Sequence, residues 1–273
     1  MDQNLIASPS IVQNSKQGCV FLVGAGPGDP ELLTLKAVKA IGQATVLLVD
    51  DLVNEEVLVH AAPGVRIIHV GKRGGCKSTA QSLIERLMIH EARCGEIVVR
   101  LKGGDPFIFG RGGEEVQHLR AAGLHVHVIN GVTAGLAAAT SLSIPLTHRD
   151  TAHGVVFITG HNKPGGQSND WETLAVCAHK SHLTLVIYMG VSSVESIANG
   201  LLKGLPQTTP VVIVQNASLI SQRQAGCTLK DLVNTVKEKR LASPSVMIVG
   251  DVAAAFAAMA TEHSSELTQA EAA

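Results

Sequence analysis

The chain has 273 residues, a net charge of −1 and a hydrophobic content of 45%. This length suits one large domain or two modest domains with a sizeable core. Aromatic residues make up only 3% and no basic block occurs, so a surface that binds nucleic acid through base stacking or phosphate contacts is not expected.

The cysteines and the two ends of the chain indicate a cytoplasmic protein. Five cysteines are scattered without Cys-x-x-Cys spacing, which favours neither a disulfide framework nor a zinc site. No apolar run reaches the length of a membrane span, so no membrane partner is expected. Residues 1–16 lack the apolar core of a signal peptide and are interpreted as a disordered tail, and residues 257–273 as a flexible tail.

Strand-type and helix-type segments alternate along the whole chain. In the first half, strands are predicted at 19–23, 45–49, 66–70, 97–101 and 124–129, and helices at 31–43, 79–93, 114–122 and 136–141. In the second half, strands at 155–159, 183–189, 210–215 and 245–249 alternate with helices at 171–177, 194–203 and 229–239, and residues 221–228 suit an antiparallel excursion. The pattern predicts an α/β fold with two α/β domains, residues 17–150 and 151–256, largely parallel sheets and an interdomain cleft.

The loop after the first strand, residues 24–30, has the outline of a dinucleotide-binding fingerprint but departs from it. Asp29 stands where the third glycine is expected, and Pro27 and Pro30 remove amide donors that a pyrophosphate would use. The loop therefore favours a ligand without phosphates. A nicotinamide-dependent oxidoreductase that uses this loop and Asp50 remains an alternative.

Residues 97–115 place a strand, a glycine-rich loop and the start of a helix next to one another. Asp105, Arg111 and Glu114 bring three ionisable groups into ten residues, which is typical of a functional site. Ligands of open parallel sheets bind at the carboxyl ends of strands, so this loop is predicted to contact a ligand. The alternative is a plain strand–helix connection in which Glu114 is an acid at a helix start.

Two further groups of side chains allow a functional and a structural interpretation. Lys72 and Arg73 follow the third strand, where they could clamp an anion or belong to a solvated loop. His125 and His127 share one face of a strand, but no third ligand is evident, so no metal site is predicted.

Taken in order, several segments resemble the tetrapyrrole methylases, and within that family the enzymes that methylate uroporphyrinogen III. The segments are residues 23–36, 70–73, 100–115, 144–149 and 188–190, and the resemblance covers roughly residues 18–252. It implies a two-domain α/β fold, a homodimer and S-adenosylmethionine bound between the domains. It also implies methylation at C2 and C7, through precorrin-1 to precorrin-2, for sirohaem, cobalamin or haem d1 biosynthesis.

Carried over to matching positions, the resemblance also implies a cofactor site. Its residues would be Pro27, Gly103, Gly104, Asp105, Ile108, Thr133, Ala134, Met189 and Ala217. The sequence departs from the family pattern at Cys76 and Lys77, where relatives often carry histidine. It departs again at Gln215 and Ser218, which replace Glu and Thr.

The charges of the chain agree with this chemistry. A sulfonium cofactor without phosphates suits an acid-bearing, proline-stiffened loop better than NAD does. The eight carboxylates of uroporphyrinogen require cations, and the predicted substrate-binding residues are Lys72, Arg73, Lys102, Arg111 and Arg149.

The reaction itself predicts a small catalytic set. The methyl donor is already activated, so the protein must mainly align it with a pyrrole carbon. The methylated ring is a cation that must lose a proton. Glu114 and Asp50 are predicted to stabilise that cation or to accept the proton, with His148 a weaker candidate. Arg111 is predicted to grip a carboxylate near the reacting ring. The alternatives are a methylase acting on a later corrin intermediate and a non-catalytic tetrapyrrole carrier.

Overall fold

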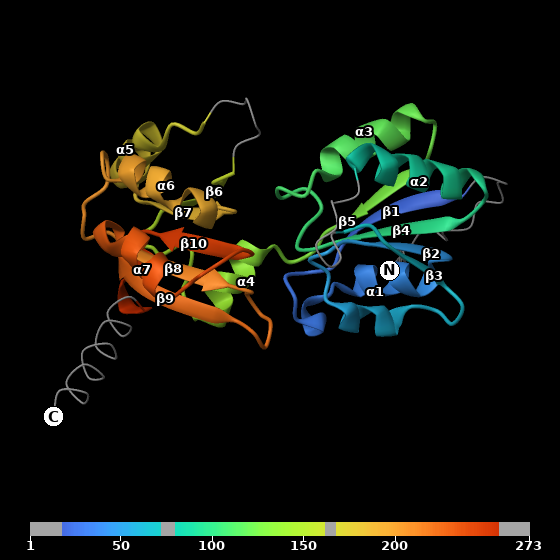
Figure 1. Cartoon of the computed structure of the whole chain (residues 1–273), viewed down its shortest axis with the longest axis horizontal. Coiled ribbons are helices and arrows are strands. Elements are labelled where there is room, and N and C mark those ends of the chain that lie inside the picture. Colours follow the sequence, from blue (N-terminus) through green and yellow to red (C-terminus); the bar gives the residue numbers. More distant parts are fainter. Residues whose placement is uncertain (1–17, 72–79, 162–167, 257–273) are drawn as a thin grey trace, which may run out of the picture.

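The computed structural model describes residues 18–71, 80–161 and 168–256, which form two α/β domains side by side (Figure 1). Each domain contains one five-stranded sheet. The prediction of an α/β fold with two α/β domains is therefore confirmed. Within the described residues, no helix combines the length and the apolar character needed to cross a membrane.

The first sheet is entirely parallel, with strand order β3-β2-β4-β1-β5. Its strands are β1 (Cys19–Gly24), β2 (Val46–Val49), β3 (Arg66–His69), β4 (Ile97–Lys102) and β5 (Val126–Ile129). Because all five strands point the same way, the loops that follow them meet at one edge of the sheet. The glycine-rich loops after β1 and β4 therefore become neighbours.

Helices cover both faces of this sheet (Figure 1). The first face packs against α1 (Leu35–Gln43) and a short 3-10 helix at Glu55–His60, and the second against α2 (Gln81–Arg93) and α3 (Gly112–Ala121). Successive residues of each strand point to opposite faces of the sheet. Because helices cover both faces, the buried strands are apolar along most of their length.

The second sheet is mixed, with strand order β6-β7-β10-β8-β9. Its strands are β6 (Gly154–Thr159), β7 (Leu183–Tyr188), β8 (Pro210–Gln215), β9 (Arg223–Thr228) and β10 (Ser245–Val249). Only β6 and β7 are parallel, since β10 inserts antiparallel between β7 and β8. The expectation of largely parallel sheets thus describes the first domain. The predicted antiparallel excursion at 221–228 becomes β9.

The two faces of the second sheet have different partners. One face packs against α5 (Trp171–Lys180), α6 (Val194–Leu201) and α7 (Leu232–Glu238), and the other against α4 (Ala134–Ser141). Helix α4 was predicted to belong to the first domain, but Ala138 and Ala139 pack with residues of β7, β8 and β10. This packing favours a domain boundary at about residues 130–133, earlier than the predicted residue 150.

The packing of β9 predicts unequal reactivity among the cysteines. Cys227 is buried in the core of the second domain, and burial raises the pKa of its thiol to about 11. Because the thiolate is the reactive form, Cys227 should resist alkylation at pH 8. The exposed Cys94 and Cys177 should react within minutes under native conditions. Peptide mapping after iodoacetamide treatment measures this. Native labelling of Cys227 as fast as that of Cys94 would contradict the packing described for β9.

Candidate functional site between the two sheets

Three loops meet backbone to backbone at the carboxyl edge of the first sheet. A Cβ added to Gly24 would lie 2.4 Å from the amide nitrogen of Gly131, and one added to Gly131 would lie 2.2 Å from the carbonyl oxygen of Gly104. The Gly104 amide donates to the Gly26 carbonyl at 2.6 Å. Only glycine allows this approach, so the loops after β1, β4 and β5 form one continuous surface.

Asp105 locks these loops together. The carboxylate is buried, and its two oxygens accept the amide protons of Phe107 at 2.8 Å and Gly131 at 3.2 Å. Asn130 Nδ2 donates to the second oxygen at 3.4 Å. Asp105 was predicted to accept hydrogen bonds from the cofactor. In the structure its two oxygens accept three hydrogen bonds from the loops, so Asp105 holds the neighbouring backbone in place, and acceptance from the cofactor stays a prediction.

Several predicted cofactor residues come together where the first domain meets the second. Ile108, Ala134 and Ala217 pack in the same apolar cluster, although they come from three distant parts of the chain. Thr133 is buried at the start of α4, and Met189 follows β7 with 42% of its surface exposed. Pro27 is half-buried in the loop after β1.

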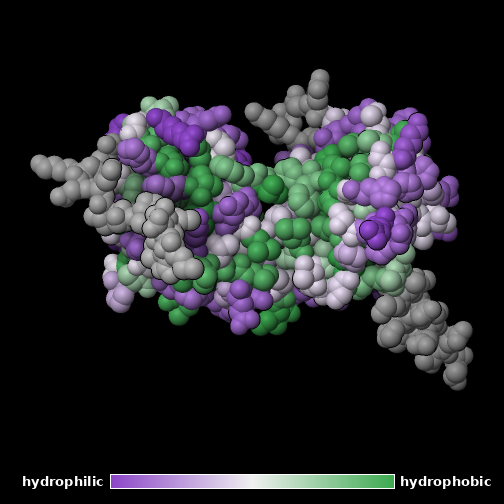
Figure 2. Space-filling model, turned by 180° about the vertical axis from the view of Figure 1, so that it is seen from behind, coloured by the Kyte–Doolittle hydropathy of each residue, from purple (hydrophilic) through white to green (hydrophobic). Residues whose placement is uncertain are grey.

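The loops after β1 and β8 also touch one another. The amide of Asp29 donates to Ser218 Oγ at 3.0 Å, and a Cβ on Gly28 would collide with the side chain of Leu219. Hydrophobic residues gather at the middle of the molecule between two lobes with more polar surfaces (Figure 2). The junction therefore carries hydrophobic residues, and the loops after β1 and β8 connect the two domains by direct contact.

The residues at this junction fit a ligand that touches backbone. Gly104 has φ +68°, and a Cβ there would reach only van der Waals distance, 3.9 Å, from the backbone of Thr133 and Ala134. The absent side chain leaves room opposite the start of α4. S-adenosylmethionine, which carries no phosphate, fits such a cradle without needing a basic residue in the loop.

Arg111 and Glu114 form an exposed ion pair with each other. Arg111 Nε and Nη2 donate to the two oxygens of Glu114 at 3.1 Å and 2.6 Å, and this hydrogen bonding raises the pKa of Arg111. Arg111 has φ 59° and stands in the left-handed conformation immediately before α3. Both side chains were predicted to act on the substrate. The structure pairs them with each other, so binding of a substrate carboxylate by Arg111 would require it to release Glu114.

A buried charge cluster lies under the loop that follows β4. Glu115 is 0% exposed and accepts from Gln81 Nε2 at 2.8 Å, Lys102 Nζ at 3.3 Å and Arg100 Nε at 3.5 Å. Arg100 Nη2 lies 3.4 Å from Asp50 Oδ1. Burial and the neighbouring Arg100 lower the pKa of Lys102, and Glu115 opposes part of that effect. Lys102 was predicted to bind substrate, but its ammonium group faces this cluster.

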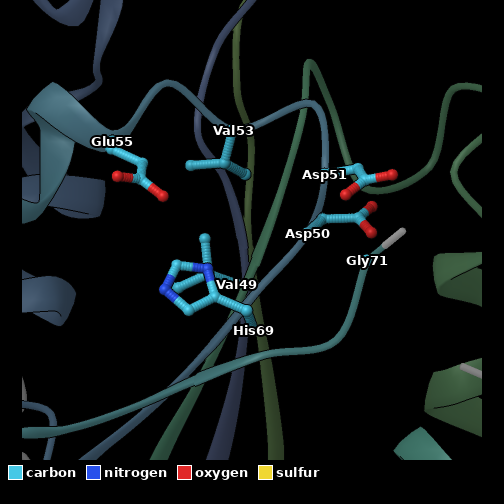
Figure 3. Close-up of a pocket in the computed structure, with 7 residues that line it drawn as sticks. All are labelled: Val49, Asp50, Asp51, Val53, Glu55, His69 and Gly71. Atoms are coloured by element: carbon cyan, nitrogen blue, oxygen red, sulfur yellow. The ribbon is translucent and has the colours of Figure 1, made fainter. Parts of the chain in front are cut away.

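Asp50 joins the buried cluster to an open pocket. Its side chain is 33% exposed and lines a pocket of about 160 Å³ at the carboxyl ends of β2 and β3. Figure 3 shows the carboxylates of Asp50 and Asp51 beside Gly71, with Glu55 and His69 on the opposite side. Three acidic side chains repel carboxylates, so this pocket suits proton acceptance better than binding of an anionic group.

Within the described part of the chain, the structure does not bring the remaining predicted substrate-binding residues next to Asp50 or Arg111. Lys72 and Arg73 lie outside the described residues, and Arg149 is exposed in the turn that precedes β6. In residues 18–71, 80–161 and 168–256, no group of three or more His, Cys, Asp or Glu side chains is arranged to hold a metal ion.

Sequence reasoning missed the buried ion pairs of Arg100 and Glu115. Two basic residues on one face of an otherwise apolar strand, Arg100 and Lys102, were the available signal for a buried counter-charge. The partner Glu115 could not be chosen over Glu114 without knowing which side of α3 faces the sheet.

Comparison with known proteins agrees with this arrangement. Residues 19–233 match the family model described as Tetrapyrrole (Corrin/Porphyrin) Methylases. The chain belongs to the tetrapyrrole methylase family. It is 49% identical over 236 residues to the uroporphyrinogen-III C-methyltransferase of Pseudomonas aeruginosa, an alignment covering 86% of this chain and 94% of that protein.

Solved structures of other tetrapyrrole methylases share the fold. A Thermus thermophilus uroporphyrin-III C-methyltransferase complexed with S-adenosylhomocysteine aligns with a TM-score of 0.71 and 42% identity, covering 86% of this chain and 98% of that one. A cobalt precorrin-4 methyltransferase aligns with a TM-score of 0.77 and 26% identity, covering 89% and 99%. The predicted family is confirmed.

The buried cluster makes a testable prediction about stability. Replacing Glu115 by Ala leaves Arg100 and Lys102 as buried cations without their shared anion, which should cost about 3–5 kcal/mol in the free energy of unfolding. Urea denaturation of the purified variant measures this loss. The matched control is Glu114→Ala on the exposed side of the same helix, which should cost much less.

A double variant separates lost charge from lost packing. Lys102→Met combined with Glu115→Gln removes one charge of each sign and keeps an acceptor for Arg100 and Gln81. It should be more stable than Glu115→Ala. Equal stability of wild type and Glu115→Ala would show that the cluster does not hold this end of α3.

Proposed function

We propose that this chain transfers methyl groups from S-adenosylmethionine to C2 and C7 of uroporphyrinogen III, giving precorrin-2 through precorrin-1. The observation that carries the proposal is the 49% identity with the Pseudomonas aeruginosa enzyme over nearly all of that protein. The convergence of the matching loops at one junction, residues 24–30, 103–111, 130–135 and 189, supports it. The product would feed sirohaem, cobalamin or haem d1 biosynthesis.

The donor would lie against the loops of both domains. When bound, S-adenosylmethionine supplies a methyl group on a positively charged sulfur. The open space at Gly104 faces the backbone of Thr133 and Ala134, and Ile108 and Ala217 line the same cluster. Pro27, Gly103 and Met189 would complete the site, while Asp105 keeps the loops in register. Holding the donor rigidly is the main catalytic contribution, because alignment converts the reaction into an effectively unimolecular step.

The macrocycle would be oriented by cations. Arg111 presents an exposed planar guanidinium just before α3, and once released from Glu114 it can bind a carboxylate in bidentate fashion. Lys72, Arg73 and Arg149 are further candidates for the remaining carboxylates. Lys102 would act indirectly, because its ammonium group pairs with Glu115 beneath the loop.

The proton released after methyl transfer requires an acceptor. Asp50 is the favoured candidate, because its partly exposed carboxylate lines a pocket and forms an ion pair with the buried Arg100. Glu114 is a second candidate that becomes available only when Arg111 turns towards the substrate.

Two further statements belong to the same proposal. We infer a homodimer, on the family resemblance of the sequence. We also infer a cytoplasmic location, which the separate and unpaired cysteines of the described residues favour.

The direct test is an assay with enzymatically prepared uroporphyrinogen III and methyl-labelled S-adenosylmethionine without oxygen. Two labels per macrocycle are expected. Absence of label from this macrocycle would remove the substrate assignment, and label in a later corrin intermediate instead would assign the chain to another step. Tight NADH binding without binding of the methyl donor would favour the oxidoreductase alternative.

Arg111→Lys tests the gripping role. Lysine keeps the charge but cannot make two parallel hydrogen bonds to a carboxylate, so turnover should fall at least about tenfold. Affinity for S-adenosylhomocysteine, measured by calorimetry, should stay within about twofold of wild type. Arg120→Lys, at an exposed position near the end of α3, is the matched control and should leave both quantities unchanged. Unchanged turnover in Arg111→Lys would remove Arg111 from the site.

A further inference from the structure

Tyr188 is the last residue of β7, and its buried hydroxyl connects the second sheet to the start of α4. The amide of Gly135 donates to Tyr188 Oη at 2.8 Å, and Thr133 Oγ1 lies 2.8 Å from the same oxygen. A Cβ on Gly135 would lie only 2.3 Å from that hydroxyl. Burial raises the pKa of the phenol, so the group stays a neutral hydrogen-bonding partner.

The ring of Tyr188 makes a second connection, to the first domain. The Phe109 ring lies 5.0 Å from it in a tilted arrangement, and Phe157 of β6 lies 6.0 Å away edge-on. Phe109 belongs to the loop that begins at Gly103 and ends at Arg111. One side chain therefore touches segments from both domains.

The backbone at both ends of this contact is strained. Phe109, Arg111 and Met189 have φ values of 54°, 59° and 54°, although none of them is glycine. Such left-handed conformations are unfavourable for residues that carry a side chain, and they persist only where packing enforces them. The Phe109–Tyr188 contact lies between these residues and can enforce the conformation on both sides.

We propose that Tyr188 is a positioning residue that sets the methyl donor and the macrocycle relative to each other. Its hydroxyl holds the turn at Thr133–Gly135 on the donor side. Its ring holds Phe109, and through the loop it fixes the direction of Arg111 on the acceptor side. This inference deepens the proposed function and rests on it, since both sides are defined by the methyl-transfer reaction.

The two connections can be removed separately. Tyr188→Phe removes the hydroxyl and keeps the ring, so affinity for S-adenosylhomocysteine should fall about tenfold in calorimetry, with kcat at saturating donor reduced less than threefold. Phe109→Leu keeps the hydroxyl contacts, so donor affinity should stay within about twofold while kcat falls about tenfold. A residue that serves only stability would change both quantities together.

A control and a double variant sharpen the test. Phe157→Leu removes the other aromatic neighbour of Tyr188, and it should lower the melting temperature while leaving donor affinity and kcat within about twofold. Thr133→Val breaks the same hydrogen bond from the opposite side. Combined with Tyr188→Phe, it should weaken donor binding by much less than the product of the two single effects.

Each outcome is decisive. Wild-type affinity in Tyr188→Phe, full additivity with Thr133→Val, or equal loss of affinity and kcat in Tyr188→Phe and Phe109→Leu would overturn the inference. Failure of the wild-type protein to methylate uroporphyrinogen III would instead overturn the proposed substrate, while the calorimetric comparison would still decide the role of the hydroxyl. Failure of wild type to bind S-adenosylhomocysteine would overturn both.

Discussion

The site depends on three backbones passing one another without side chains. A Cβ on Gly24 or on Gly131 would collide with the neighbouring backbone, including the carbonyl of Gly104, and would force the loops after β1, β4 and β5 apart. This approach lets Asp105 reach the amide of Gly131 and fasten the loops with buried hydrogen bonds. Once fastened, they present backbone atoms rather than side chains at the junction, which suits a ligand recognised through shape and neutral hydrogen bonds.

The charged residues near that surface fall into a buried group and a partly exposed group. Arg100 and Lys102 are buried and share Glu115, and Asp50 beside Arg100 supplies the second negative charge, so the cluster contributes rigidity at the end of β4. The side chains of Asp50 and Arg111 are partly exposed to solvent and are the ones proposed to meet the substrate. The buried residues Arg100, Lys102 and Glu115 can therefore affect the reaction only by positioning the exposed residues Asp50 and Arg111.

The second domain supplies a further set of contacts to the loop that follows β4. Tyr188 links α4, Phe109 and the segment that follows β7, and Ile108 packs into the apolar cluster of the second sheet. The loop from Gly103 to Arg111 is therefore held by both domains. The loop has two different anchors, Asp105 at one end and the Phe109–Tyr188 contact near the other, and the proposed donor and acceptor ends correspond to them.

The amino-acid sequence by itself determined the alternation of strands and helices, the glycine-rich loops and the residues that carry the family resemblance. These features are local: apolar periodicity, turn residues and motif spacing are written within short stretches of chain. Most strand and helix positions were predicted to within a few residues, and β9 was expected as an antiparallel element.

Only the tertiary structure decided the order of the strands and the partners of the charges. Insertion of β10 between β7 and β8, packing of α4 on the second sheet and burial of Lys102 against Glu115 all join residues that are distant in sequence or ambiguous in direction. Lys102 and Glu115 look like surface charges when read along the chain. Whether a charge faces solvent or a buried partner depends on which helix covers that face of the strand, and this is settled by packing of the whole domain.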